Sequence, residues 1–437
     1  MLITFTAKNF KSFKNEFIFS MMPAPKQKGL DCSLLTEKIG AKKCKALCSS
    51  VIYGLNASGK TNVIEAMETF KSIILRGNIR NSDDKTVHTA GNMLELIPNN
   101  SCREKKPLEF SIKFIENSIL FEYSLLIDIG PFLDSYYKRK ILMEKLSING
   151  KLIFNRENVL DFGNFKVIRK YLIKGFEENR NGAVSIAKNS LNEEDLFLMN
   201  GFKTMFSLKL VNIITDWMEN KFIIIYKNDC LHLIKKYLDS SEQSEYMKKG
   251  IQDLVRIFGV NPNTLEYIPS DDDSENRLCS IFEGMDKGSA ISAELFESYG
   301  TIKFVNMLPL ILSTLQNGGT LVIDEFDASL HPMVIINIIN IFHNKHINIK
   351  NAQLIFNTHN PIFLNSHIFR RDEVKFVKRN SETSTQYTLS DFGTAGQKGV
   401  RKNEDYMKNY FSNEYGAIKN IDFAPILENI MKLYPKN

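Results

Sequence analysis

Alternating apolar and polar residues dominate the first third of the chain and predict β-strands. Residues 2–9 alternate in this way, apart from Leu2, and a second alternating stretch passes through Phe17 and Phe19, so the two stretches predict a hairpin. Residues 50–53 form a short β-branched and aromatic run that predicts a buried strand. Between them, residues 22–45 contain Pro, Gly and Lys without periodicity and predict a loop.

Two further hairpins follow. Residues 108–129 hold two alternating runs separated by Glu116-Asn117-Ser118, and residues 145–154 hold two more runs joined by Asn149-Gly150. An Asn-Gly pair accommodates the positive φ angles of a type I′ turn. We therefore expect an antiparallel sheet that continues to about residue 160.

Helical spacing replaces the alternation farther along, and predicts a mainly helical insertion over residues 161–285. A long apolar helix is expected at residues 302–315, and apolar runs at 320–323 and 353–356 predict buried parallel strands. The expected organisation is a first lobe at 1–160, the insertion at 161–285, a second lobe at 286–400 and a tail at 401–437.

Composition narrows the class of protein. The 437 residues are 43% hydrophobic, enough for two or three domains with full cores. The net charge of +6 is compatible with nucleic acid but does not argue for it, because 56 basic residues face 50 acidic ones. Six cysteines without paired metal spacing indicate free thiols in a reducing compartment. No signal peptide or membrane-spanning run is recognised, so we expect a cytoplasmic protein that does not enter a membrane.

A glycine-bounded motif follows the strand predicted at 50–53. It reads Gly-x-x-x-x-Gly-Lys-Thr and is followed by helical spacing from Asn62 onward. A chance glycine-rich turn would lack this flanking strand and helix. Backbone N–H groups of such a loop hold phosphates, Lys60 neutralises their outer oxygens, and the Thr61 hydroxyl binds Mg²⁺. The motif predicts nucleoside triphosphate binding by Gly54, Asn56, Ala57, Ser58, Gly59, Lys60, Thr61 and Asn62.

Two carboxylates end the strand predicted at 320–323. Asp324 is expected to hold Mg²⁺, directly or through water, and Glu325 to take the proton from an attacking water. A solvated Asp-Glu pair is the plain alternative, but the residues that follow begin another helix. These two carboxylates predict hydrolysis of the bound nucleotide.

Further candidate residues lie, like those above, at a predicted helix start or at the end of a predicted strand. Ser298 and Gly300 precede the long apolar helix and form either a second phosphate-binding helix end or an ordinary serine cap. His359 ends the strand predicted at 353–356, where it could reach a γ-phosphate. His331, beside Pro332 at a helix start, is interpreted as structural.

Taken in order, these motifs resemble the ABC-type ATPases of the SMC, RecF and OLD branch. The matching residues are Asn9 to Phe13, the loop at 54–61, Ser298 with Gly300, Asp324 with Glu325, and His359. A narrower resemblance is to stand-alone bacterial AAA-family ATPases of anti-phage systems, the AbiL, RloA and PARIS AriA types. It is carried by residues 324–332, 370–373, 389–392 and 410–418.

The resemblance implies an α/β, ABC-type P-loop fold with a mixed central sheet, an antiparallel β-subdomain and a helical insertion. It also implies a composite site in which two subunits sandwich two ATP molecules with Mg²⁺, each ATP held by one P-loop and the partner's Ser298-Gly300 helix end. Lys11, Ser12 and Asp327 are further nucleotide contacts implied in the same way. The chain departs from the family in lacking a Leu-Ser-Gly-Gly-Gln string and a recognisable Q-loop glutamine.

Two functions compete. The first is a homo-oligomeric ATPase that senses phage infection and controls a separate effector, a nuclease, because no second catalytic centre is recognised. The alternative is a RecF-like or SMC-like DNA-binding ATPase of repair or maintenance, which would show a basic face and DNA-stimulated hydrolysis. Basic clusters such as Lys42-Lys43 permit DNA binding without arguing for it. A transporter subunit is a weaker third interpretation.

Overall fold

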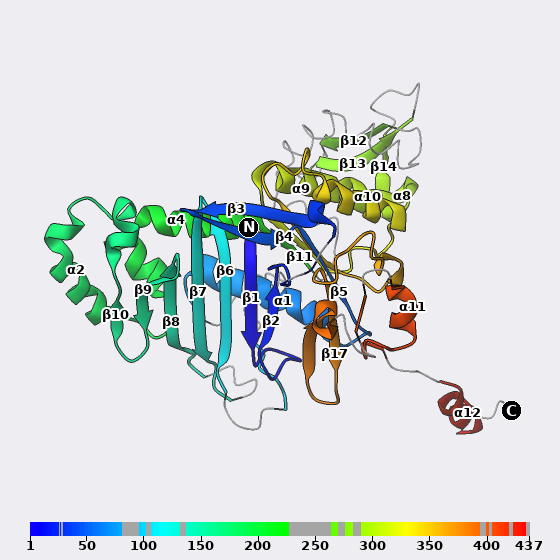
Figure 1. Cartoon of the computed structure of the whole chain (residues 1–437), viewed down its shortest axis with the longest axis horizontal. Helices are drawn as coiled ribbons and strands as arrows, with labels where there is room; N and C mark the ends of the chain where they lie inside the picture. Colours follow the sequence, from blue (N-terminus) through cyan, green and yellow to red (C-terminus); the bar gives the residue numbers. More distant parts are fainter. Residues whose placement is uncertain are drawn as a thin grey trace.

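Figure 1 presents a computed structural model of the chain. The structure describes residues 1–25, 27, 29–80, 96–101, 106–131, 137–226, 264–269, 276–282, 290–393, 399–401, 404–418 and 423–433. A mixed six-stranded sheet and an antiparallel seven-stranded sheet, with helices packed against them, make up most of the molecule. The expected α/β fold class, with a mixed central sheet and an antiparallel β-subdomain, is confirmed.

The central sheet carries the glycine loop. Its strands, in spatial order, are β11 (Phe222–Ile225), β15 (Thr320–Ile323), β16 (Gln353–Asn357), β5 (Ser49–Tyr53), β17 (Val374–Arg379) and β18 (Ser384–Thr388). The first five are parallel, and β18 is antiparallel to β17. Since the carboxyl ends of parallel strands share one edge, the segments after β5, β15 and β16 meet there.

Helices cover both faces of this sheet. Ile52 belongs to the core that holds α1 (Lys60–Arg76) and the antiparallel sheet. Its neighbours Val51 and Tyr53 belong to the core that holds α9 (Tyr299–Asn317) and α10 (Pro332–His343). Alternate residues of one strand thus serve two cores, which explains why β5 is buried throughout.

The antiparallel sheet contains all the predicted hairpins of the first lobe. Its order is β10 (Leu160–Phe162), β9 (Lys151–Arg156), β8 (Lys140–Ile148), β7 (Ile119–Asp128), β6 (Leu108–Glu116), β1 (Leu2–Lys8) and β2 (Phe17–Ser20). Asn149 and Gly150 have φ of 51° and 75°, which confirms the type I′ turn.

One buried amide joins the two sheets. The Gln353 carbonyl oxygen accepts hydrogen bonds from Leu2 N at 2.6 Å and Thr320 Oγ1 at 2.9 Å. Its NH₂ group donates to the carbonyl oxygens of Leu2 at 3.0 Å and Leu47 at 2.9 Å. Every hydrogen-bonding position of this fully buried side chain is therefore used.

The predicted loop at residues 22–45 is wrong in its second half. A 3₁₀ turn (Asp31–Ser33) leads into an antiparallel pair, β3 (Leu34–Ile39) and β4 (Lys42–Leu47). Leu35 and Ala46 bury against the start of β1 in a small separate core. Three lysines in β4 hide the alternation in the sequence, because its outer face is solvated.

The insertion is helical only in part. Its helical segments are a 3₁₀ helix (Phe165–Tyr171), α2 (Phe176–Asn189), a π-helix (Leu198–Phe202), α3 (Lys203–Met205), α4 (Leu208–Asp216) and a π-helix (Trp217–Lys221). The next four residues form β11 of the central sheet. Farther on, β13 (Asn276–Ile281) pairs with β12 (Thr264–Pro269) on one side and β14 (Ile291–Ser292) on the other. The expectation of mainly helical structure over 161–285 is therefore wrong at these strands. Residues 227–263 lie outside the described chain.

The remaining helical elements lie near the second lobe and the tail. They are α8 (Ala293–Phe296), a 3₁₀ turn (Pro361–Phe363), a second (Leu389–Phe392), α11 (Tyr406–Phe411) and α12 (Ala424–Leu433). In Figure 1, α12 stands away from the body of the molecule. Of the helices described, none combines the length and apolar character needed to span a bilayer.

Candidate nucleotide-binding site

The glycine loop links β5 to α1 at the carboxyl edge of the central sheet. Gly59, the residue before α1, has φ of 106°, and a Cβ there would lie 2.4 Å from Ser12 Oγ. The positive φ favours glycine at this position, and the close approach of Ser12 from the turn at residues 10–13 leaves little room for a side chain. Ala57 also has a positive φ, 60°, which curls the loop over the start of the helix.

The Lys60 side chain is hydrogen-bonded to the main chain of the loop. Its Nζ donates to the carbonyl oxygens of Gly54 at 2.9 Å and Leu55 at 3.0 Å, and the residue is 5% exposed. Burial lowers the pKa of Lys60 to about 8, while the charges of Asp324, Glu325 and Asp327 act to raise it. A cation held in a desolvated loop is suited to an anionic ligand.

A buried oxygen of the loop is unsatisfied. Ser58 is 3% exposed, and its Oγ has no hydrogen-bond partner among the described residues. This oxygen would lie 2.7 Å from a Cβ built on Gly54, so it points across the inside of the loop. Since buried polar atoms are normally paired, this hydroxyl fits a loop that receives a polar ligand.

The structure joins two residues predicted to bind Mg²⁺. Thr61 Oγ1 donates to Asp324 Oδ1 across 3.0 Å. An octahedral Mg²⁺ with ligands at about 2.1 Å places adjacent oxygens about 3 Å apart, so this pair fits two neighbouring ligand positions. Burial raises the pKa of Asp324, and hydrogen bonds from Asn357 and Thr61 oppose that rise.

Asn357 is a site residue that sequence reasoning did not single out. It is fully buried at the end of β16, and its Nδ2 donates to Asp324 Oδ1. Its Oδ1 accepts the main-chain N–H of Glu325 at 2.5 Å. One side chain therefore contacts both the Asp324 carboxylate and the main chain of Glu325 at the end of β15. The sequence feature that could have identified Asn357 is its position at the end of the predicted strand, directly before Thr358 and His359, where only the histidine was considered.

Glu325 itself has an unusual main chain and an exposed side chain. Its φ is 49°, a left-handed conformation that non-glycine residues adopt infrequently. Lys303 of α9 donates from Nζ to the carbonyl oxygens of Glu325 at 2.9 Å and Ala328 at 3.0 Å. Lys303 is 1% exposed and was also missed, because it interrupts an otherwise apolar helix without any motif.

Ser298 and Gly300 lie at the start of α9. Ser298 caps the helix, with its Oγ accepting the N–H of Thr301 at 3.1 Å. A Cβ on Gly300 would be 2.2 Å from the carbonyl oxygen of Ser329, so the first turn of α9 packs directly on the segment that follows Asp327. The cap is thus present, and phosphate binding by this helix end stays a prediction.

The two histidines differ as the sequence suggested. His331 caps α10 by accepting the N–H of Met333 on Nδ1 at 3.2 Å, which confirms its structural role. His359 is exposed near the loop, and partial burial together with the charge of Lys60 lowers its pKa. A neutral imidazole there could accept or donate a hydrogen bond.

The turn at residues 10–13 approaches the loop from the other side. Asn62 Nδ2 donates to Ser12 Oγ at 2.7 Å, and Lys11 Nζ lies 2.9 Å from Glu65 of α1. Ser384 connects the same groups by donating from Oγ to Ser58 O at 2.6 Å and from N to Ser12 O at 2.7 Å. The structure therefore brings Ser12 and Asn62 to the loop, and directs the Lys11 amine to α1.

A pocket of about 330 Å³ adjoins the outer side of the loop. Its lining consists of Leu55 to Ser58, Lys378 to Ser381 of the β17–β18 turn, and Gly416 to Ile418 of the tail. The tail is held there by Tyr387, whose OH donates to Tyr415 O at 2.6 Å. The C-terminal stretch singled out in the sequence therefore lies beside the glycine loop.

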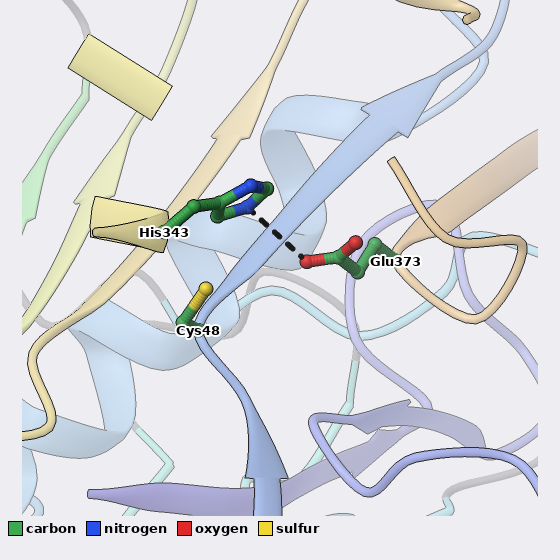
Figure 2. A group of neighbouring side chains, drawn as sticks. All are labelled: Cys48, His343 and Glu373. Carbon is green, nitrogen blue, oxygen red and sulfur yellow. Dashed lines mark ion pairs between the residues drawn. The ribbon is translucent and has the colours of Figure 1, made fainter. Parts of the chain in front are cut away.

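Cys48, His343 and Glu373 form a buried group with donor atoms suited to zinc (Figure 2). Two of these side chains already have a protein hydrogen-bond partner. Ser49 Oγ donates to Glu373 Oε1 at 2.7 Å and lies 2.9 Å from His343 Nε2. Arg370 N donates to Glu373 Oε2 at 2.7 Å. Burial raises the pKa of the Cys48 thiol well above its usual value, which disfavours the thiolate that binds metal. We interpret the group as a structural network at the amino ends of β5 and β17.

The geometry at the carboxyl edge defines the class: the chain is a P-loop nucleotide-binding protein. Residues 49–365 match the family model described as "AAA domain, putative AbiEii toxin, Type IV TA system", and the chain belongs to this family. The narrower resemblance to the AbiL, RloA and PARIS AriA types stays a prediction. No curated protein sequence matches the chain.

Two solved structures are similar over most of the chain. One is the SMC head bound to the C-winged helix domain of ScpA, with 12% identity, a TM-score of 0.39, and coverage of 89% of this chain and 97% of that one. The other is the SMC head domain from Thermotoga maritima, with 14% identity, a TM-score of 0.38, and coverage of 89% and 98%. At these TM-scores the likeness assigns no residue a role.

Proposed function

We propose that the chain binds and hydrolyses ATP at the carboxyl edge of the central sheet. The observation that carries this proposal is the Thr61–Asp324 contact of 3.0 Å beside Lys60, with Glu325 the next residue along the chain. The loop N–H groups, Ser58 and Lys60 hold the phosphates. Thr61 and Asp324 would hold Mg²⁺, which neutralises phosphate charge when bound.

Hydrolysis needs a base within reach of a water beside the γ-phosphate. The exposed carboxylate of Glu325 takes a proton from that water, whose oxygen attacks phosphorus while the bond to the ADP oxygen breaks. Asn357 fixes the main chain of this residue from its N–H side. His359, kept largely neutral, contacts the outgoing phosphate.

ATP-dependent pairing of two copies is the proposed output. The cap at Ser298 leaves the start of α9 near the surface, where the helix end can meet a nucleotide bound by a second copy. Contacts made through ATP exist only in the paired state and are lost on hydrolysis, so the nucleotide sets the equilibrium between the two states.

The cellular role we propose is regulation of a separate effector in bacterial anti-phage defence, the effector being a nuclease. This role is motivated by the narrower resemblance carried by residues 324–332 and 410–418. The family description, which names a putative toxin of a type IV TA system, supports a place in such a system. DNA repair is the competing role and predicts duplex DNA as the partner. Nothing among the described contacts favours it.

The test is affinity purification of the Glu325→Gln protein from its native host with ATP. A stoichiometric protein partner with nuclease activity supports the defence role. Duplex DNA without such a protein contradicts that role and favours repair. The parallel assay is ATP hydrolysis by the purified wild type, with Lys60→Ala as the inactive reference; equal rates for the two would overturn the assignment of the loop.

A further inference from the structure

A buried lysine links the helix α9 to the hydrolytic segment. Lys303 lies one turn into α9, and its Nζ donates to the carbonyl oxygens of Glu325 and Ala328. Transfer of an ammonium group into a protein interior is unfavourable unless its donors are used. Burial of Lys303 carries a desolvation cost, and the buried amine is placed where it donates a hydrogen bond to the main chain of Glu325, the proposed base.

The segment 325–329, whose main-chain oxygens accept hydrogen bonds from Lys303, is conformationally strained. Glu325 and Ser329 have φ of 49° and 67°, left-handed values that the surrounding structure has to maintain. Glu325 is held from both sides. Asn357 Oδ1 accepts its N–H, while Lys303 Nζ at 2.9 Å and Ala328 N at 3.1 Å donate to its carbonyl oxygen. Without the Lys303 contact, the peptide after Glu325 is held by the longer hydrogen bonds of Ala328 N to Glu325 O at 3.1 Å and of Phe326 N to Asn357 O at 3.3 Å, so it is restrained less and its carboxylate can shift.

The same helix contacts the segment at a second point. The first turn of α9 packs on the carbonyl oxygen of Ser329, where even a Cβ on Gly300 would collide at 2.2 Å. Gly300 and Lys303 therefore contact the two ends of the segment 325–329 from one helix face. A displacement of the start of α9 is transmitted to Glu325 through both contacts.

We propose that Lys303 is a positioning residue for ATP hydrolysis, and that it couples the position of the start of α9 to that of the Glu325 carboxylate. This inference rests on the proposed ATPase activity. Lys303 touches neither nucleotide nor water in this role; it acts through the main chain of Glu325. Its removal is therefore expected to change the rate of the chemical step and to leave ATP binding intact.

The test compares kcat and the ATP dissociation constant of the wild type with those of Lys303→Met. Since misplacement of a reacting group by about 1 Å can cost about 100-fold in rate, we expect kcat to fall about 100-fold. The dissociation constant should stay within about twofold, and Lys303→Arg, which restores a cationic donor, should recover part of the lost rate. Expressing kcat per bound nucleotide removes any contribution from unfolded protein.

Lys71→Met is the matched control. Lys71 is also a buried lysine, and its Nζ donates to the carbonyl oxygen of Phe222 at 2.6 Å, at the opposite end of the sheet. We expect this variant to lower the melting temperature and to keep kcat within about twofold of the wild type.

Three outcomes are decisive. A Lys303→Met protein that binds ATP and turns over at the wild-type rate overturns the inference, as does an equal fall of kcat in both lysine variants. If Lys303→Met does not fold, Lys303→Gln is measured in its place with the same criteria. A wild type that hydrolyses no ATP refutes the proposed function itself, so the two failures are distinguishable.

Discussion

Thr61 Oγ1 and Asp324 Oδ1 lie 3.0 Å apart and share a hydrogen bond, which ties the end of the P-loop to the end of β15. The residues are 263 positions apart in the chain, yet their oxygens meet because β5 and β15 flank β16 in parallel. If the protein hydrolyses ATP with Mg²⁺ as proposed, its affinity for the metal should depend on this pair.

Thr61→Val keeps the shape of the side chain and removes its oxygen. We expect the Mg²⁺ concentration for half-maximal ATP hydrolysis to rise about tenfold, since one charge-assisted contact is lost. Titration of Mg²⁺ at fixed ATP measures this. Thr69→Val on the same helix is the control and should titrate like the wild type. An unchanged titration for Thr61→Val would remove Thr61 from the metal site.

Glu325→Gln should separate binding from hydrolysis. Loss of a general base costs about 10²–10⁴ in rate, while the amide keeps the size of the carboxylate, so nucleotide binding should persist. With ATP and Mg²⁺, gel filtration should then show a dimer that the wild type forms only transiently. Lys60→Ala is expected to bind no nucleotide and stay monomeric. Wild-type turnover in Glu325→Gln would show that another group is the base.

Lys60 predicts a pH dependence of ATP binding. Its pKa of about 8 lies below the value of about 10.4 of an unfolded lysine. Between these values the unfolded chain binds more protons, so this residue makes the folding stability rise with pH there. ATP requires the charged amine, and affinity should therefore fall above pH 8 by as much as tenfold per pH unit.

Isothermal titration of ATP at pH 7, 8 and 9 measures this dependence. In buffers of different ionisation enthalpy, the wild type should take up a proton on binding at pH 9. Lys60→Arg stays charged throughout and should show a flat profile. A flat wild-type profile would mean that the Lys60 pKa is not lowered.

The buried group around Glu373 should control stability rather than metal content. Both carboxylate oxygens accept a hydrogen bond, from Ser49 Oγ and Arg370 N. A Gln at this position keeps one acceptor for Arg370 N but turns its NH₂ group to Ser49 Oγ, which loses the acceptor of its hydrogen bond. Glu373→Gln should lower the free energy of unfolding by about 1–3 kcal/mol.

Glu109→Gln, which breaks the exposed ion pair with Lys8 at 3.3 Å, is the control and should change stability by less than about 1 kcal/mol. Denaturant unfolding measures both variants. A loss of bound zinc on Glu373→Gln, detected by elemental analysis, would contradict the structural interpretation.

Local patterns were sufficient for the P-loop, the strands that border it and the Asn149-Gly150 turn. In each case the signal lies within a few consecutive residues, where periodicity or a turn preference acts. The ligand pair Thr61 and Asp324 could also be foreseen, because both follow parallel strands. Their roles in binding and hydrolysis stay predictions.

The missed features depend on tertiary context. Phe222–Ile225 is four consecutive apolar residues, which are compatible with either a buried helix or a buried strand. Asn357 and Lys303 carry no motif, and their importance appears only when β16 and α9 are placed beside the segment 325–329. Long-range hydrogen bonds of this kind leave no local trace in a sequence.

The saturated amide of Gln353 limits how this protein can move. Sliding of the antiparallel sheet over the central sheet would break both buried hydrogen bonds between Gln353 and the main chain of Leu2. Without new partners for those groups, such shear is strongly opposed. We therefore expect the two sheets to keep their relative position during nucleotide turnover. Movement should occur on the opposite face of the central sheet, where α9 and α10 lie.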